Sequence, residues 1–169
     1  GLPTIEAGLA RAIAHKDSVG AVINCTITGL PIGLGEPFWD SCESVLAHAM
    51  FSIPAVKGIQ FGKGFEAANM LGTEHNDSII DRKGTTATNH AGGIVGGITN
   101  GNPLSFDLAF KPTASTPKEQ HSYNFETEQI EAFSIKGRHD LCVALRAPAI
   151  IEAMAHIAIC DLLLLNKKQ

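Results

Sequence analysis

Three stretches of the chain alternate between apolar and polar residues with the period of two that is typical of a half-buried β-strand. The clearest is residues 104–110, in which Leu and Phe alternate with Ser, Asp and Ala. The others are residues 21–28, which are rich in β-branched side chains, and residues 55–62; residues 128–135 are predicted as a fourth strand. We expect these strands to form a sheet with one buried face.

Two stretches before the middle of the chain have apolar residues at helical spacing. Residues 4–15 begin at Thr4, which is a candidate N-cap. A second helix is expected over residues 41–51, where either Asp40 or Ser41 provides the N-cap. The two segments predict helices that pack their apolar faces on the sheet.

Two further helices are expected later in the chain. Residues 64–71 form a short helical pattern, and the polar residues 72–88 that follow predict a long, mobile surface loop or lid. Residues 148–166 form a long helix that begins with Pro148, a residue suited to a first helical turn. Apolar residues cover much of its circumference, so we expect this helix to pack on more than one side.

The order of the predicted elements favours one α+β domain. It is helix, strand, helix, strand, helix, glycine-rich loop, strand, strand and helix, within 169 residues that suffice for a sizeable core. The strands are too few for a large doubly wound sheet. Helices packed on a mainly antiparallel sheet fit best.

Composition excludes several classes of function. The net charge of −4 gives no basic footprint for a nucleic acid. The longest apolar run, residues 153–165, is interrupted by His156 and Asp161, so we expect no membrane span. No pair of cysteines has the spacing of metal ligands, and we expect no metal site.

The cysteines and the first residues bear on the origin of the chain. The four cysteines have apolar sequence neighbours, so they predict reduced, mostly buried thiols in a cytoplasmic protein. They are Cys25, Cys42, Cys142 and Cys160. The chain starts in a helical pattern without a methionine, which predicts a cut or processed end.

Two stretches could bind an anion through backbone amides and hydroxyls. Residues 89–102 contain five glycines, which either form an anion-binding nest or allow a turn to pack tightly against the sheet. Residues 111–115, Lys-Pro-Thr-Ala-Ser, follow the strongest strand and offer an ammonium and two hydroxyls. They could contact a phosphate or the polar rim of a flavin, or form an ordinary polar turn.

A third stretch combines a cation, an imidazole and a carboxylate at Arg138, His139 and Asp140. In an extended segment Arg138 and Asp140 would share a face, with the guanidinium suited to an anion and the carboxylate able to accept a proton. The alternative is a salt-bridged surface turn. Arg146 and Lys111 could add positive charge toward an anionic ligand.

In combination, these stretches closely resemble chorismate synthases over nearly the whole chain. The resemblance is carried by ordered blocks, which are far more specific together than any one of them. They are Asp17-Ser18-Val19-Gly20, Gly35-Glu36-Pro37, Ala55-Val56-Lys57-Gly58, Asn89-His90-Ala91-Gly92-Gly93, Lys111-Pro112-Thr113 and Gly137-Arg138-His139-Asp140.

The resemblance implies a lyase of the shikimate pathway. The family converts 5-enolpyruvylshikimate 3-phosphate to chorismate and phosphate by a 1,4-anti elimination that needs reduced FMN. Some members reduce the flavin with NADPH themselves. The resemblance also implies a β-α-β sandwich, with a helical layer between two sheets, and a homotetramer.

The resemblance implies roles for particular residues. Asp140 would be the catalytic base that helps to deprotonate the flavin ring, and Arg138 would bind both substrate and flavin. The remaining implied flavin contacts lie in three separate blocks. They are Ala55, Gly96, Lys111, Pro112, Thr113, Ala114 and Ser115.

The chain also departs from the family pattern. Pro54 stands where many members have Asn, and Leu141 where Pro is usual. The Gly-x-Ser-His-Gly and Arg-Pro-Gly-His segments that supply the two catalytic histidines do not occur in residues 1–169, so the chain corresponds to the C-terminal half of the enzyme. Three hypotheses follow: half of a working lyase, a non-catalytic FMN- or phosphate-binding fragment, and a purely structural α+β module.

Overall fold

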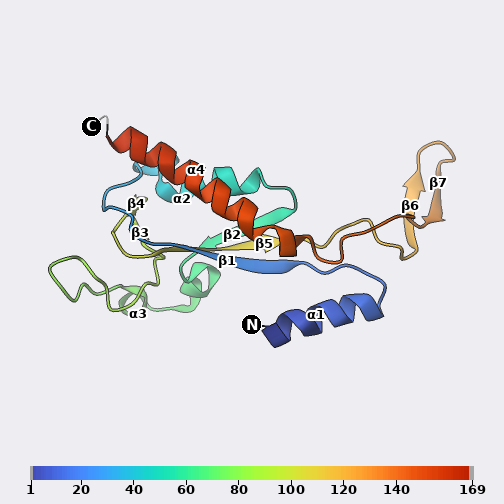
Figure 1. Cartoon of the computed structure of the whole chain (residues 1–169), viewed down its shortest axis with the longest axis horizontal. Coiled ribbons are helices and arrows are strands. Elements are labelled where there is room, and N and C mark those ends of the chain that lie inside the picture. The colour runs from blue at the N-terminus through green and yellow to red at the C-terminus, as the bar shows by residue number, and fades with distance from the viewer. Residues whose placement is uncertain (1, 168–169) are drawn as a thin grey trace.

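A three-stranded antiparallel sheet forms the centre of the computed structural model, which describes residues 2–167 (Figure 1). The strands are β1 (Ala21–Ile27), β2 (Val56–Phe61) and β5 (Leu104–Phe110), in the order β1-β5-β2. Leu108 in the central strand lies opposite Ile23 of β1 and Ile59 of β2. Alternate residues of β5 are buried, as the sequence pattern predicts for a sheet with one buried face.

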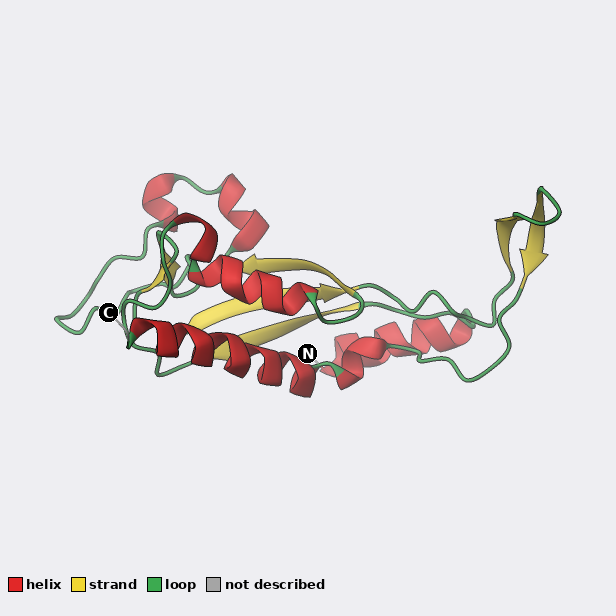
Figure 2. Ribbon diagram, turned by 90° about the horizontal axis from the view of Figure 1, so that it is seen from above, coloured by secondary structure: helices red, strands yellow, loops and turns green. Residues whose placement is uncertain are grey.

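Two helices cover the buried face of the sheet, as Figures 1 and 2 show. They are α2 (Cys42–Phe51) and α4 (Pro148–Asn166), and they pack against each other. The side chains of Leu46 and Met50 from α2 and Ile151 from α4 are at most 1% exposed. The predicted α+β fold with helices on an antiparallel sheet is therefore confirmed.

The other face of the sheet is polar. Asp107 of β5 accepts a hydrogen bond from Asn24 Nδ2 of β1 and another from Gln60 Nε2 of β2, both at 2.9 Å. The three side chains form a ladder across the strands and satisfy the carboxylate. The alternation of the sequence therefore separates an apolar core face from a hydrogen-bonded outer face.

The remaining elements surround this core. A helix, α1 (Leu2–Ala14), precedes β1, and the β3–β4 hairpin precedes β5. A second hairpin, β6–β7, stands away from the body in Figure 1. The short elements are η1 (Phe38–Asp40), η2 (Gly64–Asn69), α3 (Gly72–His75), β3 (Ile94–Val95), β4 (Ile98–Thr99), β6 (Gln120–Asn124), β7 (Gln129–Phe133) and η3 (Val143–Arg146).

The structure confirms two of the predicted helix starts and corrects two other helix predictions. Ser41 caps α2 by accepting a hydrogen bond from the N–H of Ser44 at 3.1 Å, and Pro148 starts α4 as expected. Thr4 is not an N-cap, because α1 already begins at Leu2. The predicted helix over 64–71 is the 3-10 helix η2.

The structure corrects the expectation that α4 packs on more than one side. Ile151, Ala155 and Ile159 are buried, whereas Ile157 on the outer surface is 62% exposed. By length and composition alone α4 could cross a membrane, but the core helix of a soluble domain gives the same pattern. Because α4 packs on α2 and β1, we interpret it as a core helix with one uncovered face.

The cysteine predictions hold in part. All four cysteines are free thiols. Cys42 and Cys142 are buried, and burial raises the pKa of Cys42 to about 12. Cys25 is half-buried, and Cys160 lies exposed on α4, contrary to the expected burial.

Candidate active site

One end of the sheet, where β5 ends and β2 begins, brings two of the predicted flavin-contact blocks together. The N–H of Lys111 donates to the carbonyl of Ala55 at 2.9 Å, next to the paired residues Val56 and Phe110. Ala55 has a φ of +72°, a left-handed conformation that is rare for a residue with a side chain. The antiparallel register thus joins residues that are 56 positions apart in the chain.

The segment that follows β5 borders an open cavity of about 590 Å³. Its lining includes Lys111, Pro112, Thr113 and Ala114. The carbonyl of Ala114 accepts a hydrogen bond from Gln120 Nε2 at 3.2 Å, which ties the segment to the start of β6. The cavity is therefore bordered by an ammonium, a hydroxyl and exposed backbone. Ser115, the last residue of the predicted block, is half-buried beside it.

Asp140 lies in the loop between β7 and η3. Its Oδ1 is 3.0 Å from Arg146 Nη2, and the two side chains are 42% and 66% exposed. His139 Nε2 lies 3.0 Å from the carbonyl of Ile135. Arg138 is exposed in the same loop. The cation that contacts Asp140 is therefore Arg146, a residue that from the sequence could have added positive charge toward an anionic ligand.

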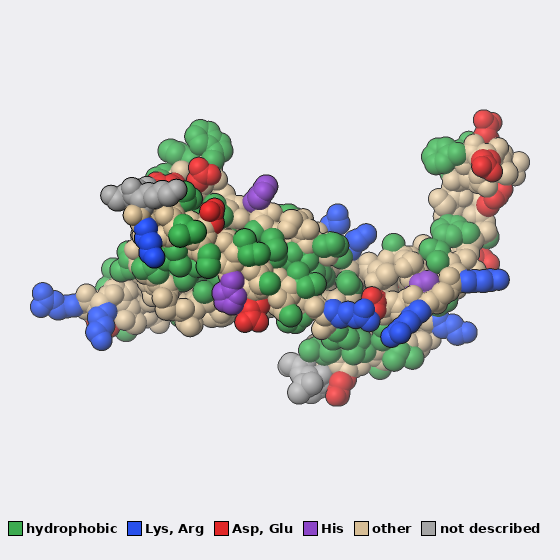
Figure 3. All heavy atoms as spheres, turned by 45° about the horizontal axis from the view of Figure 1, so that its top comes forward, with side chains coloured by type: hydrophobic (Ala, Val, Ile, Leu, Met, Phe, Trp, Pro, Cys, Tyr) green, Lys and Arg blue, Asp and Glu red, His purple; other side chains and the backbone are tan. Residues whose placement is uncertain are grey.

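A second cavity, of about 290 Å³, lies beside Asp140 and His139. Asp17 and Ser18 line it, and the same two residues line the cavity next to Lys111. The turn after α1 thus separates the two predicted site segments. In Figure 3, Lys and Arg side chains gather on this side of the molecule, around α1 and toward the β6–β7 hairpin.

Asp17 is a charged residue of this region whose role sequence reasoning did not predict. Its Oδ1 accepts a hydrogen bond from the backbone N–H of Ser18, and its Oδ2 lies 3.4 Å from Lys118 Nζ. The hydrogen bond from Ser18 is the main cause of a lowered pKa for the Asp17 carboxyl, and Lys118 adds to it. The family pattern contains Asp17 and Ser18, but their spacing in the sequence could not show which residues they contact.

Gly96 lies elsewhere, in the turn of the β3–β4 hairpin. The carbonyl of Gly97 accepts the N–H of Cys42 at the start of α2, whereas Ala55 follows the end of that helix. A ten-residue helix spans about 15 Å, so Gly96 and Ala55 lie at opposite ends of α2. The described residues therefore do not place Gly96 beside Lys111. It borders a separate cavity of about 650 Å³.

The glycine run serves mainly for close packing. A Cβ on Gly92 would lie 2.4 Å from the backbone nitrogen of Gly62 and 2.8 Å from the carbonyl oxygen of Ser105. Gly96, in contrast, has no atom within 4 Å of that position. The alternative of tight packing therefore holds for Gly92, while Gly96 leaves its backbone open to a ligand.

Asp77 holds the base of the predicted lid. Its side chain, 6% exposed, accepts hydrogen bonds from Thr88 Oγ1 at 2.6 Å and from the N–H groups of His90 and Ala91 at 2.8 and 2.9 Å. Burial opposes ionisation, but these hydrogen bonds prevail and lower the pKa of Asp77. Hydrogen bonds thus tie the base of this surface segment, which contains α3, to the residues that follow it.

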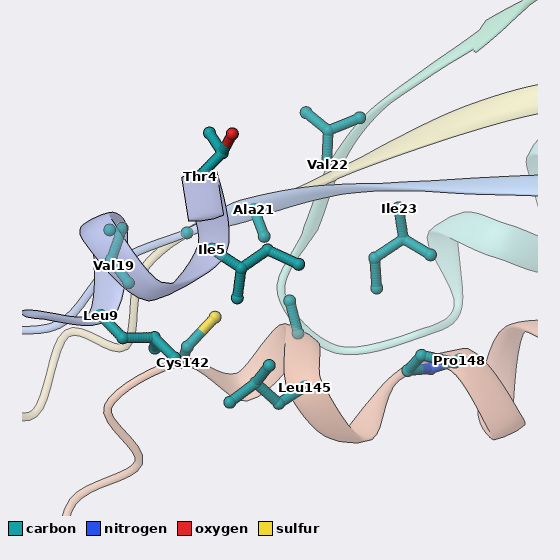
Figure 4. Close-up of a pocket in the computed structure, with 13 residues that line it drawn as sticks. Thr4, Ile5, Leu9, Val19, Ala21, Val22, Ile23, Cys142, Leu145 and Pro148 are labelled. Atoms are coloured by element: carbon teal, nitrogen blue, oxygen red, sulfur yellow. The ribbon is translucent and has the colours of Figure 1, made fainter. Parts of the chain in front are cut away.

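An apolar cavity of about 490 Å³ lies between α1, β1 and η3 (Figure 4). Ile5 and Leu9 of α1 face Ile23 of β1 and Leu145 of η3 there. Such a lining suits apolar packing rather than acid–base chemistry. Among residues 2–167, no group of three or more His, Cys, Asp and Glu side chains is placed to hold a metal ion.

Comparison with known proteins places this arrangement in a family. The family model described as chorismate synthase matches residues 3–164. The chain belongs to the chorismate synthase family. Chorismate synthase from Chitinophaga pinensis is 64% identical over 168 residues, which cover 99% of this chain and 51% of that protein.

Other members agree with this assignment. Chorismate synthase from Dehalococcoides mccartyi is 46% identical over 156 residues, which cover 91% of this chain and 43% of that protein. A crystal structure of chorismate synthase superposes with a TM-score of 0.76 at 27% identity, covering 97% of this chain and 43% of that one. The chain spans about half the length of the chorismate synthases it matches.

Proposed function

We propose that this chain forms the C-terminal half of a chorismate synthase. The enzyme would convert 5-enolpyruvylshikimate 3-phosphate to chorismate and phosphate by a 1,4-anti elimination that uses reduced FMN. Family membership supports the proposal. The observation that carries it is the convergence of residues 111–115 and Asp140 on one turn, with open cavities on both sides.

Residues 111–115 have a donor set that fits a flavin nucleotide. Lys111 offers an ammonium, Thr113 and Ser115 offer hydroxyls, and the cavity beside them is open enough to admit a ring or a phosphate. The backbone carbonyl of Ala55 holds Lys111 at this position. Held there, reduced FMN would supply electron density to the elimination without net oxidation.

Two charged residues would act next to the flavin. The ion pair with Arg146 orients Asp140 through Oδ1 and leaves Oδ2 to accept a proton. Arg138 presents an exposed guanidinium, which suits the phosphate or carboxylate groups of the substrate. Asp140 is thus proposed as the base and Arg138 as a ligand of both substrate and flavin.

The rest of the enzyme would come from a segment outside this chain. Residues 1–169 contain neither histidine segment of the family. The outer surface of α4 leaves Ile150, Ile157 and Leu164 about half exposed or more, as expected if a further layer covers it. We propose that the missing half supplies the histidines and the second sheet of a β-α-β sandwich. The chain alone would then be a non-catalytic fragment that binds FMN or phosphate.

The proposal extends to assembly and reductant. The β6–β7 hairpin exposes Tyr123, Phe125 and Ile130, and a lone two-stranded hairpin is marginally stable, which supports its docking in a homotetramer. NADPH is the proposed reductant of the flavin, and the free thiols suit a cytoplasmic enzyme.

Flavin titration tests the proposed site. We expect Lys111→Ala and Arg138→Ala each to weaken FMN binding by the full-length protein by about 10- to 150-fold, since a hydrogen bond to a charged group contributes about 1.5–3 kcal/mol. Lys63→Ala is the matched control, because the side chain of Lys63 forms an exposed ion pair with Glu66. Unchanged affinity in both site variants would contradict the assignment.

A further inference from the structure

One turn contacts both segments of the candidate active site. Ser18 Oγ donates a hydrogen bond to the carbonyl of Thr113 at 2.6 Å. The N–H of the next residue, Val19, donates to the carbonyl of Leu141 at 3.0 Å. Thr113 belongs to the proposed flavin segment, and Leu141 directly follows Asp140. Two adjacent residues of one turn therefore connect the flavin segment to the proposed base.

The turn is fixed at both of its ends. At its start, the N–H of Asp17 donates to the carbonyl of Ala12 at the end of α1, at 2.9 Å. At its end, a Cβ on Gly20 would lie 2.3 Å from the carbonyl oxygen of Phe110 and 3.2 Å from the ring of Pro112. Only a glycine allows this approach, so the turn lies directly against the start of the flavin segment.

We propose that Ser18 is a positioning residue that sets the placement of residues 111–115 relative to Asp140. The inference rests on the proposed function. Without the hydroxyl, the carbonyl of Thr113 loses its partner, and the flavin segment is free to move away from the turn that holds Leu141. A displacement of about 1 Å is enough to slow a reaction substantially when reacting groups must be aligned.

The test compares three variants of the full-length protein. Ser18→Ala removes the hydrogen bond and Ser18→Thr keeps a hydroxyl. Ser52→Ala is the matched control, because Ser52 Oγ donates to the carbonyl of Ala49, also at 2.6 Å, but at the end of α2 and within its own helix. The thermal midpoint of each variant is measured first, and the FMN dissociation constant and turnover at saturating reduced FMN are then measured well below it.

We expect Ser18→Ala to raise the FMN dissociation constant and to lower turnover at saturating flavin, each by about three- to tenfold, as one lost hydrogen bond predicts. Ser18→Thr restores both quantities, and Ser52→Ala changes neither. Lower turnover at saturating flavin is the result specific to positioning, because weaker folding or weaker flavin binding alone does not produce it.

Three results overturn the inference, and the third overturns the proposed function as well. If wild-type protein binds FMN and forms chorismate while Ser18→Ala matches Ser52→Ala, Ser18 has no positioning role. If Ser18→Thr is as impaired as Ser18→Ala, the hydroxyl is not the group that matters. Wild-type protein that neither binds FMN nor forms chorismate refutes the proposed function, and this inference fails with it.

Discussion

Asp77 should be the residue on which the ordered loop over residues 78–87 depends most. Its carboxylate accepts three hydrogen bonds that join the start of the loop to Thr88, His90 and Ala91. In Asp77→Asn the amide can still accept with one oxygen, but its NH₂ group faces a backbone N–H and leaves that donor unsatisfied. An unsatisfied buried donor costs about 1–3 kcal/mol, and more next to a lost charge.

A cost of about 2 kcal/mol has two measurable consequences. The thermal midpoint falls by about 4–8 °C for a domain of this size. The loop also opens about 30-fold more often, since 1.4 kcal/mol corresponds to a factor of ten. Trypsin reports that opening, because Arg82 and Lys83 lie at the exposed tip of the loop.

The pH dependence has a definite sign. The pKa of Asp77 is lowered in the folded protein, so its carboxylate stabilises the fold above the carboxyl's ordinary pKa, and this stabilisation is lost as the pH falls through the lower, folded value. Asp77→Asn should therefore show a smaller loss of stability on acidification than wild type. Asp40→Asn, at an exposed carboxylate on η1, is the control. A thermal midpoint and a trypsin cleavage rate that match those of Asp40→Asn would refute the reasoning.

Three further predictions concern packing. Gly92→Ala should lower the free energy of unfolding by more than 2 kcal/mol, whereas Gly96→Ala should lower it by about 1 kcal/mol because of its backbone conformation alone. Denaturant unfolding measures both losses, and equal losses would contradict the packing argument. Leu46→Ala should cost about 2–5 kcal/mol by the same assay, and a loss below 1 kcal/mol would show that the site is not a packed core. Cys160 should react with a thiol reagent in the chain alone and become protected in the full-length protein, while Cys42 should react only on unfolding. A Cys160 that still reacts in the full-length protein would mean that its surface on α4 stays uncovered.

The core strands could be predicted because their side chains alternate between two environments. Leu104–Phe110 shows this most clearly, with one face in the core and Asp107 in the polar ladder. The strand β6 escaped prediction because it is largely polar and mostly exposed, so hydrophobic alternation does not mark it. Residues 128–135 were predicted correctly as a strand, but the expectation that they join the sheet with one buried face is wrong, because β7 is exposed and pairs with β6 outside the central sheet. More than one side of α4 was expected to be packed because apolar residues cover much of its circumference, although the described residues cover only one side.

The sequence predicted which segments form the candidate site, but not which residues of those segments contact one another. The motifs around Lys111 and Asp140 identified the two segments, but their common contact with the turn at Ser18 depends on a hydrogen bond across 95 positions of the chain. A local sequence pattern does not indicate which residues so far apart in the chain will contact each other. For the same reason the resemblance, which implies that Gly96 and Lys111 both contact the flavin, does not reveal that α2 lies between them in the fold.

Anaerobic formation of chorismate tests the proposed function most directly. Full-length protein and the 169-residue chain are each given 5-enolpyruvylshikimate 3-phosphate and chemically reduced FMN. We predict turnover by the full-length protein, its loss in Asp140→Asn but not in Asp40→Asn, and none by the chain alone. A full-length protein that folds and binds FMN but forms no chorismate would contradict the proposed function, and turnover by the chain alone would contradict the need for a second half.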